Sequence, residues 1–502
     1  MSVSNLFQIH KPDILDCISH LSSDEVFTPP AIVKEMLDAL PKNLWLNPNL
    51  KFLDPSCKSG VFLREIAKRL MIGLSDEIPQ EDDRRRHIYH NMLYGIAITN
   101  LTSLVSRRTL YYTKDPAKPD SVVDFGNSNG NIFYSRGKHV YEKGKCKYCK
   151  LPDNSLDRGE HLENYAYWFI HDISTEVFNV KFDVIIGNPP YQLQDAGEST
   201  GASPIYQLFV SQAKKLQPKY ISMIIPSRWF AGGKGLDEFR REMLEDKRIS
   251  HLVDYHDAAD CFPGVEIKGG VCYFLWNANH NGPCEITPVF SGKQLEPAFR
   301  NLDEFDVLIR HHEQAAVLRK ILDKKEESLE STISTQKPFG LRTNFTDFKD
   351  KEFKGSILLY ARDAKGWISR TLITQNTQWI DKWKVIISRS FNGGYKFPHQ
   401  IINKPIVAGP GSVCTETYII LGVFDDENSA NNLATYARTK FFRFAVSFRK
   451  VSQDNPKDRF KYVPKLDFTR KWTDKLLFKR YDINSEEQNF IDTLVRVIED
   501  EK

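Results

Sequence analysis

Several features are missing from this 502-residue sequence, and each absence excludes a class of protein. No run of 18 or more apolar residues occurs, so we expect no membrane-spanning helix. The first ten residues are polar and have no basic stretch before an apolar one, so we expect no secretory signal peptide. Only eight cysteines are present, which favours reduced thiols in a cytoplasmic protein over a disulfide framework. We find no internal repeat and no low-complexity tract.

The charges that are present are unevenly distributed. Residues 331–502 hold 29 Lys and Arg against 20 Asp and Glu, whereas residues 1–330 hold 40 against 45. A basic carboxyl-terminal part is suited to contact with a phosphate backbone. A solvated basic surface without a partner would give the same counts, so charge alone leaves both interpretations open.

The most informative segment is Asn188-Pro189-Pro190-Tyr191, which follows the apolar run 182–187. A Val- and Ile-rich run that ends in Gly and two prolines predicts a buried strand that stops abruptly. The prolines donate no N–H to a sheet and keep the backbone extended. The side-chain carbonyl of Asn188 and the backbone carbonyl of Pro189 would then be fixed acceptors beside an aromatic ring. This arrangement fits a planar substrate with an NH2 group, such as adenine; the alternative is an ordinary Asn-Pro turn.

A second candidate site lies upstream, at residues 51–60. A short apolar strand runs into a turn of small residues, and a helical pattern starts at Val61. Strand, tight turn and helix form the place where an open α/β sheet binds a cofactor, and N–H groups at the start of a helix can hold a carboxylate. Before it, Thr28 occupies the expected N-cap of another helix, with prolines in the first turn.

Three motifs, FTPP at 27–30, DPSCKSG at 54–60 and NPPY at 188–191, together resemble those of the S-adenosylmethionine-dependent N6-adenine DNA methyltransferases. Their order, with a recognition domain last, is that of the gamma class, and the phrase at 337–341 resembles one type II restriction-modification subfamily. The resemblance implies an α/β, Rossmann-like class I methyltransferase fold with a doubly wound mixed sheet. A mostly β or α+β target-recognition domain would follow it.

The resemblance also implies roles for individual residues. The residues expected to bind S-adenosylmethionine are Thr28, Pro29, Asp54, Ser56, Gly60 and Asp172. The residues expected at the reacting amino group are Asn188, Pro189, Pro190 and Tyr191, with Tyr191 and Phe262 stacking on a flipped adenine. Ordinary roles remain open for two of them, a helix cap for Asp172 and core packing for Phe262.

The sequence departs from the family pattern at two positions. Lys58 replaces a usual glycine, and a lysine is strained there if φ must be positive. Ala97 stands where an acidic residue usually binds the ribose hydroxyls, and Thr99 or Asn100 could replace that contact.

The expected chemistry needs alignment more than acid–base groups. Two acceptors would hold both amino hydrogens of adenine and aim the nitrogen lone pair, and such alignment can contribute roughly 7–11 kcal/mol. The base must leave the duplex at a cost of a few kcal/mol, which stacking at about 1–3 kcal/mol per base would offset. No strong general base is required, and we identify no catalytic His or paired carboxylate.

Domain boundaries follow from composition and pattern. We expect a lead-in at 1–23, a methyltransferase domain at 24–297 with an insertion at about 112–163, a helical linker at 298–330 and a target-recognition domain at 331–502. Within the last, β-like runs occur at 384–389 and 418–421. The candidate DNA contacts are Arg342, Arg389, Lys396 and Arg443.

The insertion contains Cys146-x-x-Cys149, which could form part of a zinc site. A structural zinc needs four ligands, and no second such cysteine pair exists. His139, His161 and His171 are available as further ligands. We expect no metal.

Double-stranded DNA is the expected partner. NPPY also occurs in methyltransferases that act on RNA or on a protein glutamine, which is one alternative. Three further alternatives are an adenine methyltransferase without a cognate nuclease, a bifunctional restriction enzyme and a non-catalytic DNA-binding protein. Only about 26 residues precede Phe27, too few for a nuclease domain, so we expect a separately encoded restriction endonuclease.

Overall fold

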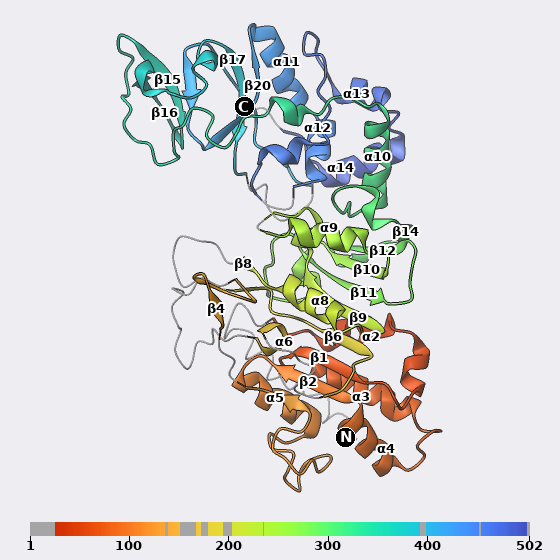
Figure 1. The fold of residues 1–502 in the computed structure, drawn as a ribbon. Coiled ribbons are helices and arrows are strands. Elements are labelled where there is room, and N and C mark those ends of the chain that lie inside the picture. The colour runs from red at the N-terminus through yellow and green to blue at the C-terminus, as the bar shows by residue number, and fades with distance from the viewer. Residues whose placement is uncertain are drawn as a thin grey trace, which may run out of the picture. The chain divides into compact units, whose positions relative to one another are not determined.

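The computed structural model describes residues 26–135, 139–150, 167–171, 179–193, 203–233, 235–391, 398–450 and 453–498. The chain divides into two compact units, Met1–Leu308 and Ile309–Lys502 (Figure 1). The predicted lead-in at 1–23 lies outside the described residues. Within those residues, no helix combines the length and the apolar character that crossing a bilayer requires.

A ten-stranded mixed sheet forms the centre of the first unit. Its order is β13-β12-β10-β11-β9-β6-β1-β2-β3, with β14 paired to β12. The strands are β1 (Phe52–Cys57), β2 (Leu93–Ala97), β3 (Ile132–Phe133), β6 (Val184–Gly187), β9 (Tyr220–Pro226), β10 (Ile249–Tyr255), β11 (Val271–Asn277), β12 (Cys284–Phe290), β13 (Lys293–Gln294) and β14 (Ala298–Arg300). Strand β1 pairs in parallel with β2 and β6, and β6 pairs in parallel with β9, whereas β11 is antiparallel to both of its neighbours.

Helices cover both faces of this sheet. They are α2 (Pro30–Asp38), α3 (Val61–Gly73), α4 (Glu81–Asn91), α5 (Asn100–Tyr111), α6 (Trp168–His171), α8 (Tyr206–Lys215) and α9 (Asp237–Glu245). Successive strand residues enter different cores: Phe52 packs with α2 and α3, while Leu53 packs with α6, α8 and α9. Alternation of this kind, with helices on each side, is the pattern of a doubly wound sheet. The predicted fold class is confirmed.

The predicted insertion at 112–163 contributes to the sheet. Strand β3 adds to its edge by pairing with β2. The hairpin of β4 (Tyr141–Glu142) and β5 (Lys145–Cys146) follows, and residues 151–163 lie outside the described part. Later in the unit, the short strands β7 (Gln192–Leu193) and β8 (Ser203–Pro204) pair beyond the NPPY segment.

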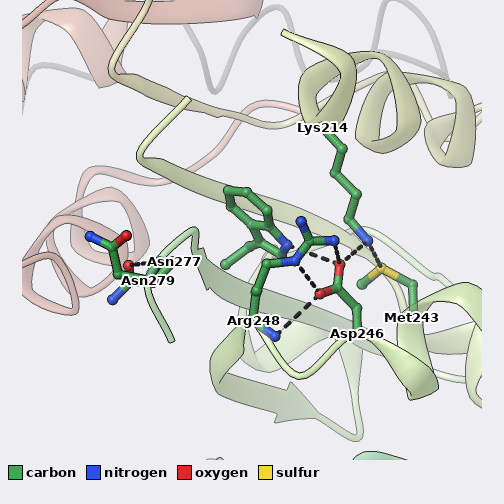
Figure 2. Close-up of polar contacts among 7 residues, drawn as sticks. Lys214, Met243, Asp246, Arg248, Asn277 and Asn279 are labelled. Carbon is green, nitrogen blue, oxygen red and sulfur yellow. Dashed lines mark hydrogen bonds and ion pairs between the residues drawn. The ribbon is translucent and has the colours of Figure 1, made fainter. Parts of the chain in front are cut away.

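A buried carboxylate joins α8, the end of α9 and β11 at the amino end of β10 (Figure 2). Asp246 accepts two hydrogen bonds from the guanidinium of Arg248, one from Trp276 Nε1 at 2.9 Å, and an ion pair from Lys214 at 2.8 Å. Although burial opposes ionisation, these donors lower the pKa of Asp246 well below its ordinary value. The network lies at the opposite end of the sheet's strands from the carboxyl ends of β1 and β6. We therefore assign it a structural role.

The second unit combines two small sheets with helices. One sheet has the order β16-β15-β19 and the other β18-β17-β20. The strands are β15 (Ser356–Ala361), β16 (Ala364–Ser369), β17 (Trp383–Ser388), β18 (Ile406–Ala408), β19 (Ser412–Cys414) and β20 (Tyr418–Phe424). The helices are α10 (His312–Asp323), α11 (Glu427–Arg438), α12 (Lys440–Ser447), α13 (Asp474–Arg480) and α14 (Ser485–Leu494). One hydrophobic cluster includes residues of both sheets. The run predicted at 384–389 overlaps β17, which ends one residue earlier, and the run at 418–421 lies in β20.

The stretch predicted as a linker, 298–330, is divided between the units. Strand β14 pairs with β12 and so completes the large sheet. Helix α10 belongs to the second unit, where Lys320 forms an ion pair with Glu487 of α14 at 2.6 Å. Sequence alone did not show that α10 belongs to the second unit, because its partner Glu487 lies 167 residues further along the chain.

Candidate active site

The DPSCKSG and NPPY motifs meet at the carboxyl ends of two central strands of the large sheet. Strands β1 and β6 are parallel neighbours, so their carboxyl ends lie side by side. Gly187, the last residue of β6, is in close contact with β1: a β-carbon there would lie 2.6 Å from Asp54 Oδ1. The aspartate turn and the NPPY segment therefore share one site.

The Asn188 side chain is buried, and two hydrogen bonds fix its orientation. Its Nδ2 donates to the Val26 carbonyl at 2.9 Å and to Thr28 Oγ1 at 3.1 Å. Its Oδ1 has no hydrogen-bond partner in the described part of the chain. Because a buried carbonyl without a partner is costly, we expect a donor to this oxygen from beyond the described residues.

The structure corrects one local prediction. Thr28 is not the N-cap of α2: Pro29 occupies that position, and no side chain caps the helix. The Thr28 hydroxyl instead accepts a hydrogen bond from Asn188, 160 residues further along the chain. A short polar residue before a helix predicts a cap on local grounds, but the buried amide is the partner that the fold provides.

Tyr191 is 8% exposed, and Pro189 and Pro190 are buried beside it. The Lys58 ammonium lies 5.8 Å from the centroid of the Tyr191 ring and donates to the Val26 carbonyl at 3.1 Å. Burial, with a further contribution from the nearby Cys261 thiol, raises the pKa of Tyr191 well above its ordinary value. The ring is therefore neutral over the physiological pH range.

Phe262 belongs to the same hydrophobic cluster as Tyr191 and is 1% exposed. Its N–H donates to the Ala258 carbonyl at 2.7 Å, which fixes the start of the loop before β11. The proposed stacking role of Phe262 is thus compatible with its place in the fold and stays a prediction.

The carboxyl-terminal half of β1 contains a buried carboxyl group. Asp54 accepts hydrogen bonds from the Ser56 N–H at 3.1 Å and from Cys57 Sγ at 3.4 Å. Burial raises the pKa of Asp54 to about 6, although both donors and the Lys58 charge oppose the shift. Ser56 Oγ is also buried and makes no hydrogen bond within the described chain.

Gly60, in the turn between β1 and α3, is a position that requires glycine. Its φ is 73°, and a β-carbon would lie 2.9 Å from the carbonyl oxygen of Ser106. Lys58 is not among the residues with positive φ, so the lysine causes no backbone strain there. The replacement is tolerated because Gly60, two residues later, makes the left-handed turn into α3.

A small cavity lies at the carboxyl ends of β1 and β2. Its lining residues are Pro55, Ile96, Ala97, Ile98, Ser135, Tyr167, Trp168 and Phe169. The Trp168 indole N–H is buried and has no acceptor in the described structure. Sequence reasoning missed the contribution of α6, although the aromatic run 167–169 directly before Asp172 was an available signal.

The groups around this cavity leave the ribose contact unassigned. Thr99 Oγ1 accepts from the Thr102 N–H at 3.0 Å in a capping box at the start of α5, so that hydroxyl is already engaged. Asn100 is exposed at the first position of the same helix. Asp172 lies outside the described residues.

The predicted DNA contacts have different environments. Arg342 is exposed and Arg389 is half-buried, whereas Lys396 lies outside the described residues. Arg443 is 1% exposed and donates to the backbone carbonyls of Thr439, Gln400 and Arg496. The prediction is wrong for Arg443, because its guanidinium is buried and donates hydrogen bonds to three backbone carbonyls.

Comparison with known proteins identifies the family of this chain. The family described as Eco57I restriction-modification methylase matches residues 91–262, which include β2, β6 and the NPPY segment. A protein of Mycoplasma pneumoniae described as an uncharacterized adenine-specific methylase is 39% identical over 348 residues, which are 63% of this chain and 82% of that relative. This chain belongs to that family of adenine-specific DNA methylases.

More distant relatives are longer proteins. The methylase is 23% identical over 265 residues to the type II restriction enzyme and methyltransferase RM.Eco57I of Escherichia coli, which is 47% of this chain and 26% of that enzyme. Among solved structures, the type IIL restriction-modification enzyme MmeI in complex with DNA has a TM-score of 0.45 and 12% identity. That match covers 90% of the methylase and 66% of MmeI.

Proposed function

We propose that this methylase transfers a methyl group from S-adenosylmethionine to N6 of an adenine that has been flipped out of a specific DNA sequence. The observation that carries the proposal is the Asn188 carbonyl oxygen. It is buried, has no partner among the described residues, and is aimed by two hydrogen bonds from the same amide. It lies beside the Asp54 loop, where a class I methyltransferase binds its cofactor.

The residues present fit S-adenosylmethionine. The bound cofactor supplies an electrophilic methyl group on a sulfonium that is an excellent leaving group. The cavity beside Ala97 would take its adenosine, with the orphaned Trp168 N–H as a donor. Asp54 and the unpartnered hydroxyl of Ser56 would face its polar groups, and Thr28 and Pro29 would contact its methionine end.

The chain's own contribution to the reaction is alignment of the adenine. Asn188 Oδ1 and the Pro189 carbonyl would each accept one N6 hydrogen, which favours a tetrahedral nitrogen with its lone pair directed at the methyl group. Tyr191 would stack on the extruded base, at about 1–3 kcal/mol. The Lys58 ammonium already lies over that ring, so we expect base entry to displace it.

The second unit would select the DNA sequence. Residues 331–502 carry nine more positive than negative charges, and Arg342 presents an exposed guanidinium. We further propose that the methylase is a gamma-class enzyme of a type II restriction-modification system. Methylation of the recognition sequence would protect host DNA from a separately encoded endonuclease.

Identification of the product tests this function. Purified protein is incubated with adenine-containing duplex DNA and methyl-labelled S-adenosylmethionine, and the digested DNA is separated into nucleosides. We expect the label in N6-methyladenine, at one sequence context when the product is sequenced. Label in RNA or protein but not in DNA would contradict the proposal, as would N6-methyladenine spread over all sequence contexts.

A further inference from the structure

Four potential metal ligands converge beside α6, outside the reaction site described above. They are His139, Cys146, Cys149 and His171, whose ligand atoms all lie within 4.8 Å of one another. Three of the four side chains are buried, and His139 is half-buried. The cysteine pair alone offered two ligands, and the fold brings the two histidines to it.

The hairpin of β4 and β5 gives the cysteine pair its shape. Its turn uses positive φ at Lys143 and Gly144, 53° and 76°, and after it the Lys147 N–H donates to the Val140 carbonyl at 2.8 Å. The Lys150 N–H then returns to the Cys146 carbonyl at 3.0 Å. This compact turn directs both thiols to the same point, as structural zinc sites with a C-x2-C pair require.

The histidines are oriented as metal ligands usually are. His171 Nδ1 lies 2.9 Å from the Tyr167 carbonyl and so carries the proton, which leaves a lone pair on Nε2. That Nε2 is buried and has no hydrogen-bond partner in the described residues. His139 Nδ1 lies 3.5 Å from Cys149 Sγ. In a tetrahedral site with zinc bonds of about 2.0–2.3 Å, ligand atoms are separated by about 3.3–3.8 Å.

We propose that His139, Cys146, Cys149 and His171 bind one zinc ion in a structural Cys2His2 site. Two thiols and two imidazoles are the ligand set that selects zinc over the oxygen-loving Mg²⁺ and Ca²⁺. With four protein ligands the site is closed, so the ion has no open position for catalysis.

The zinc would connect the insertion to the cofactor cavity. His171 ends α6, and Trp168 and Phe169 of the same short helix line that cavity. Phe169 also stacks on Phe209 of α8 at 5.6 Å. A helix of four residues is not stable alone, so the ion would hold the cavity wall in place. This consequence rests on the proposed function, whereas the zinc site does not.

Metal analysis of the full-length chain, purified without a histidine tag, tests the proposal. We expect one zinc per chain in the wild type and in the matched controls Cys284→Ala and His312→Ala, which change a cysteine and a histidine outside the cluster. Cys146→Ser and His171→Ala should lose the zinc. Full zinc occupancy in both of these variants would overturn the site.

Two measurements on the wild type keep the test independent of variant folding. Replacement by Co²⁺ should give the absorption of tetrahedral cobalt with two thiolate ligands. Release of the ion by a thiol-modifying reagent and a chelator should lower the melting temperature. A zinc-free wild type after equilibration with zinc, or a Cys146–Cys149 disulfide found by mass spectrometry, would overturn the proposal.

The coupling to the cofactor cavity has its own measurement. Calorimetry on zinc-loaded and zinc-free protein should show weaker S-adenosylmethionine binding without zinc. Equal binding would reject the coupling and leave the metal site standing, whereas failure of the loaded protein to bind S-adenosylmethionine would reject the proposed function instead.

Discussion

At the scale of single residues, the amide of Asn188 shows how a site is assembled from distant parts of the chain. The sequence predicts Asn188 as an acceptor at the end of a strand, with an ordinary Asn-Pro turn as the alternative. The two bonds that aim it were not, because Val26 and Thr28 lie about 160 residues away and reach Asn188 only once β1 and β6 are paired. Local pattern instead gave Thr28 the role of a helix cap.

Thr28 therefore provides a test of orientation. Thr28→Val removes the acceptor for Asn188 Nδ2 and leaves the shape nearly unchanged. Loss of one hydrogen bond of about 0.5–1.5 kcal/mol predicts a fall in the methyl-transfer rate of up to roughly tenfold. Thr28→Ser keeps the hydroxyl and should retain most of the rate. Single-turnover assays with saturating cofactor compare the two; equal rates in Val and Ser variants would show that this bond does not aim the amide.

Asp54 predicts a pH dependence of cofactor binding. Because burial raises the pKa of Asp54 to about 6, the group is ionised above that pH and neutral below it. The ionised form attracts the cationic cofactor, so affinity should fall as pH drops below 6, by up to about tenfold per pH unit. Calorimetry from pH 7 to pH 5 measures this, and Asp54→Asn should remove the dependence. A flat profile in the wild type would contradict the assignment.

Lys58 should shift the same profile. Its charge lowers the pKa of Asp54 and so opposes the effect of burial. Lys58→Met removes the charge, and the midpoint of the pH profile should then move to higher pH. A midpoint that stays in place or moves to lower pH would show that Lys58 does not act on Asp54.

At the scale of elements, apolar runs and strand-ending residues predicted β1, β6 and α3, and the resemblance of the motifs implied the doubly wound sheet. They did not predict the role of α6, because a four-residue helix has no periodic signal and its partners come from the sheet edge. The sequence offered His139, His161 and His171 as further zinc ligands but could not choose among them, because His139 and His171 are separated by 32 positions and meet Cys146 only in the folded chain.

The close contact between β6 and β1 at Gly187 predicts that one added methyl group destabilises the fold. In Gly187→Ala the new β-carbon would lie 2.6 Å from Asp54 Oδ1, so the carboxyl group and the loop must move. Overpacking of this kind costs about 1–3 kcal/mol of unfolding free energy, and cofactor binding should weaken with it. Denaturant unfolding and calorimetry measure both quantities.

Gly282→Ala is the matched control for that change. Its β-carbon would make only ordinary contacts, 3.6 Å and 3.7 Å from the His280 ring. We expect its stability and its cofactor binding to match the wild type. A Gly187→Ala protein as stable as this control would show that there is more space between β6 and β1 at Gly187 than the structure indicates.

At the scale of the whole molecule, the division of charge predicts which unit holds the DNA backbone. Composition predicted a basic carboxyl-terminal part, but it could not separate exposed cations from buried ones. Arg342 and Arg443 look equivalent in the sequence, yet one is exposed and the other is enclosed by three carbonyl groups.

These two arginines should therefore respond differently to substitution. Arg342→Ala should weaken DNA binding and reduce the slope of log K against log salt by about one, with the melting temperature unchanged. Arg443→Met should lower the melting temperature, because it removes the guanidinium donor to the Arg496 carbonyl and one of the donors to the Thr439 and Gln400 carbonyls. It should leave the salt slope unchanged. Fluorescence anisotropy over a salt series measures the slopes, and the reverse pattern would contradict the assignment of the two residues.

The most direct test of the whole account is the methyl-transfer rate of Asn188→Ala with cofactor bound. The account predicts S-adenosylmethionine binding close to that of the wild type, an intact fold by circular dichroism, and no detectable N6-methyladenine in a single-turnover assay. A variant that binds the cofactor and methylates adenine at the wild-type rate would show that the Asn188 carbonyl does not hold the reacting amino group.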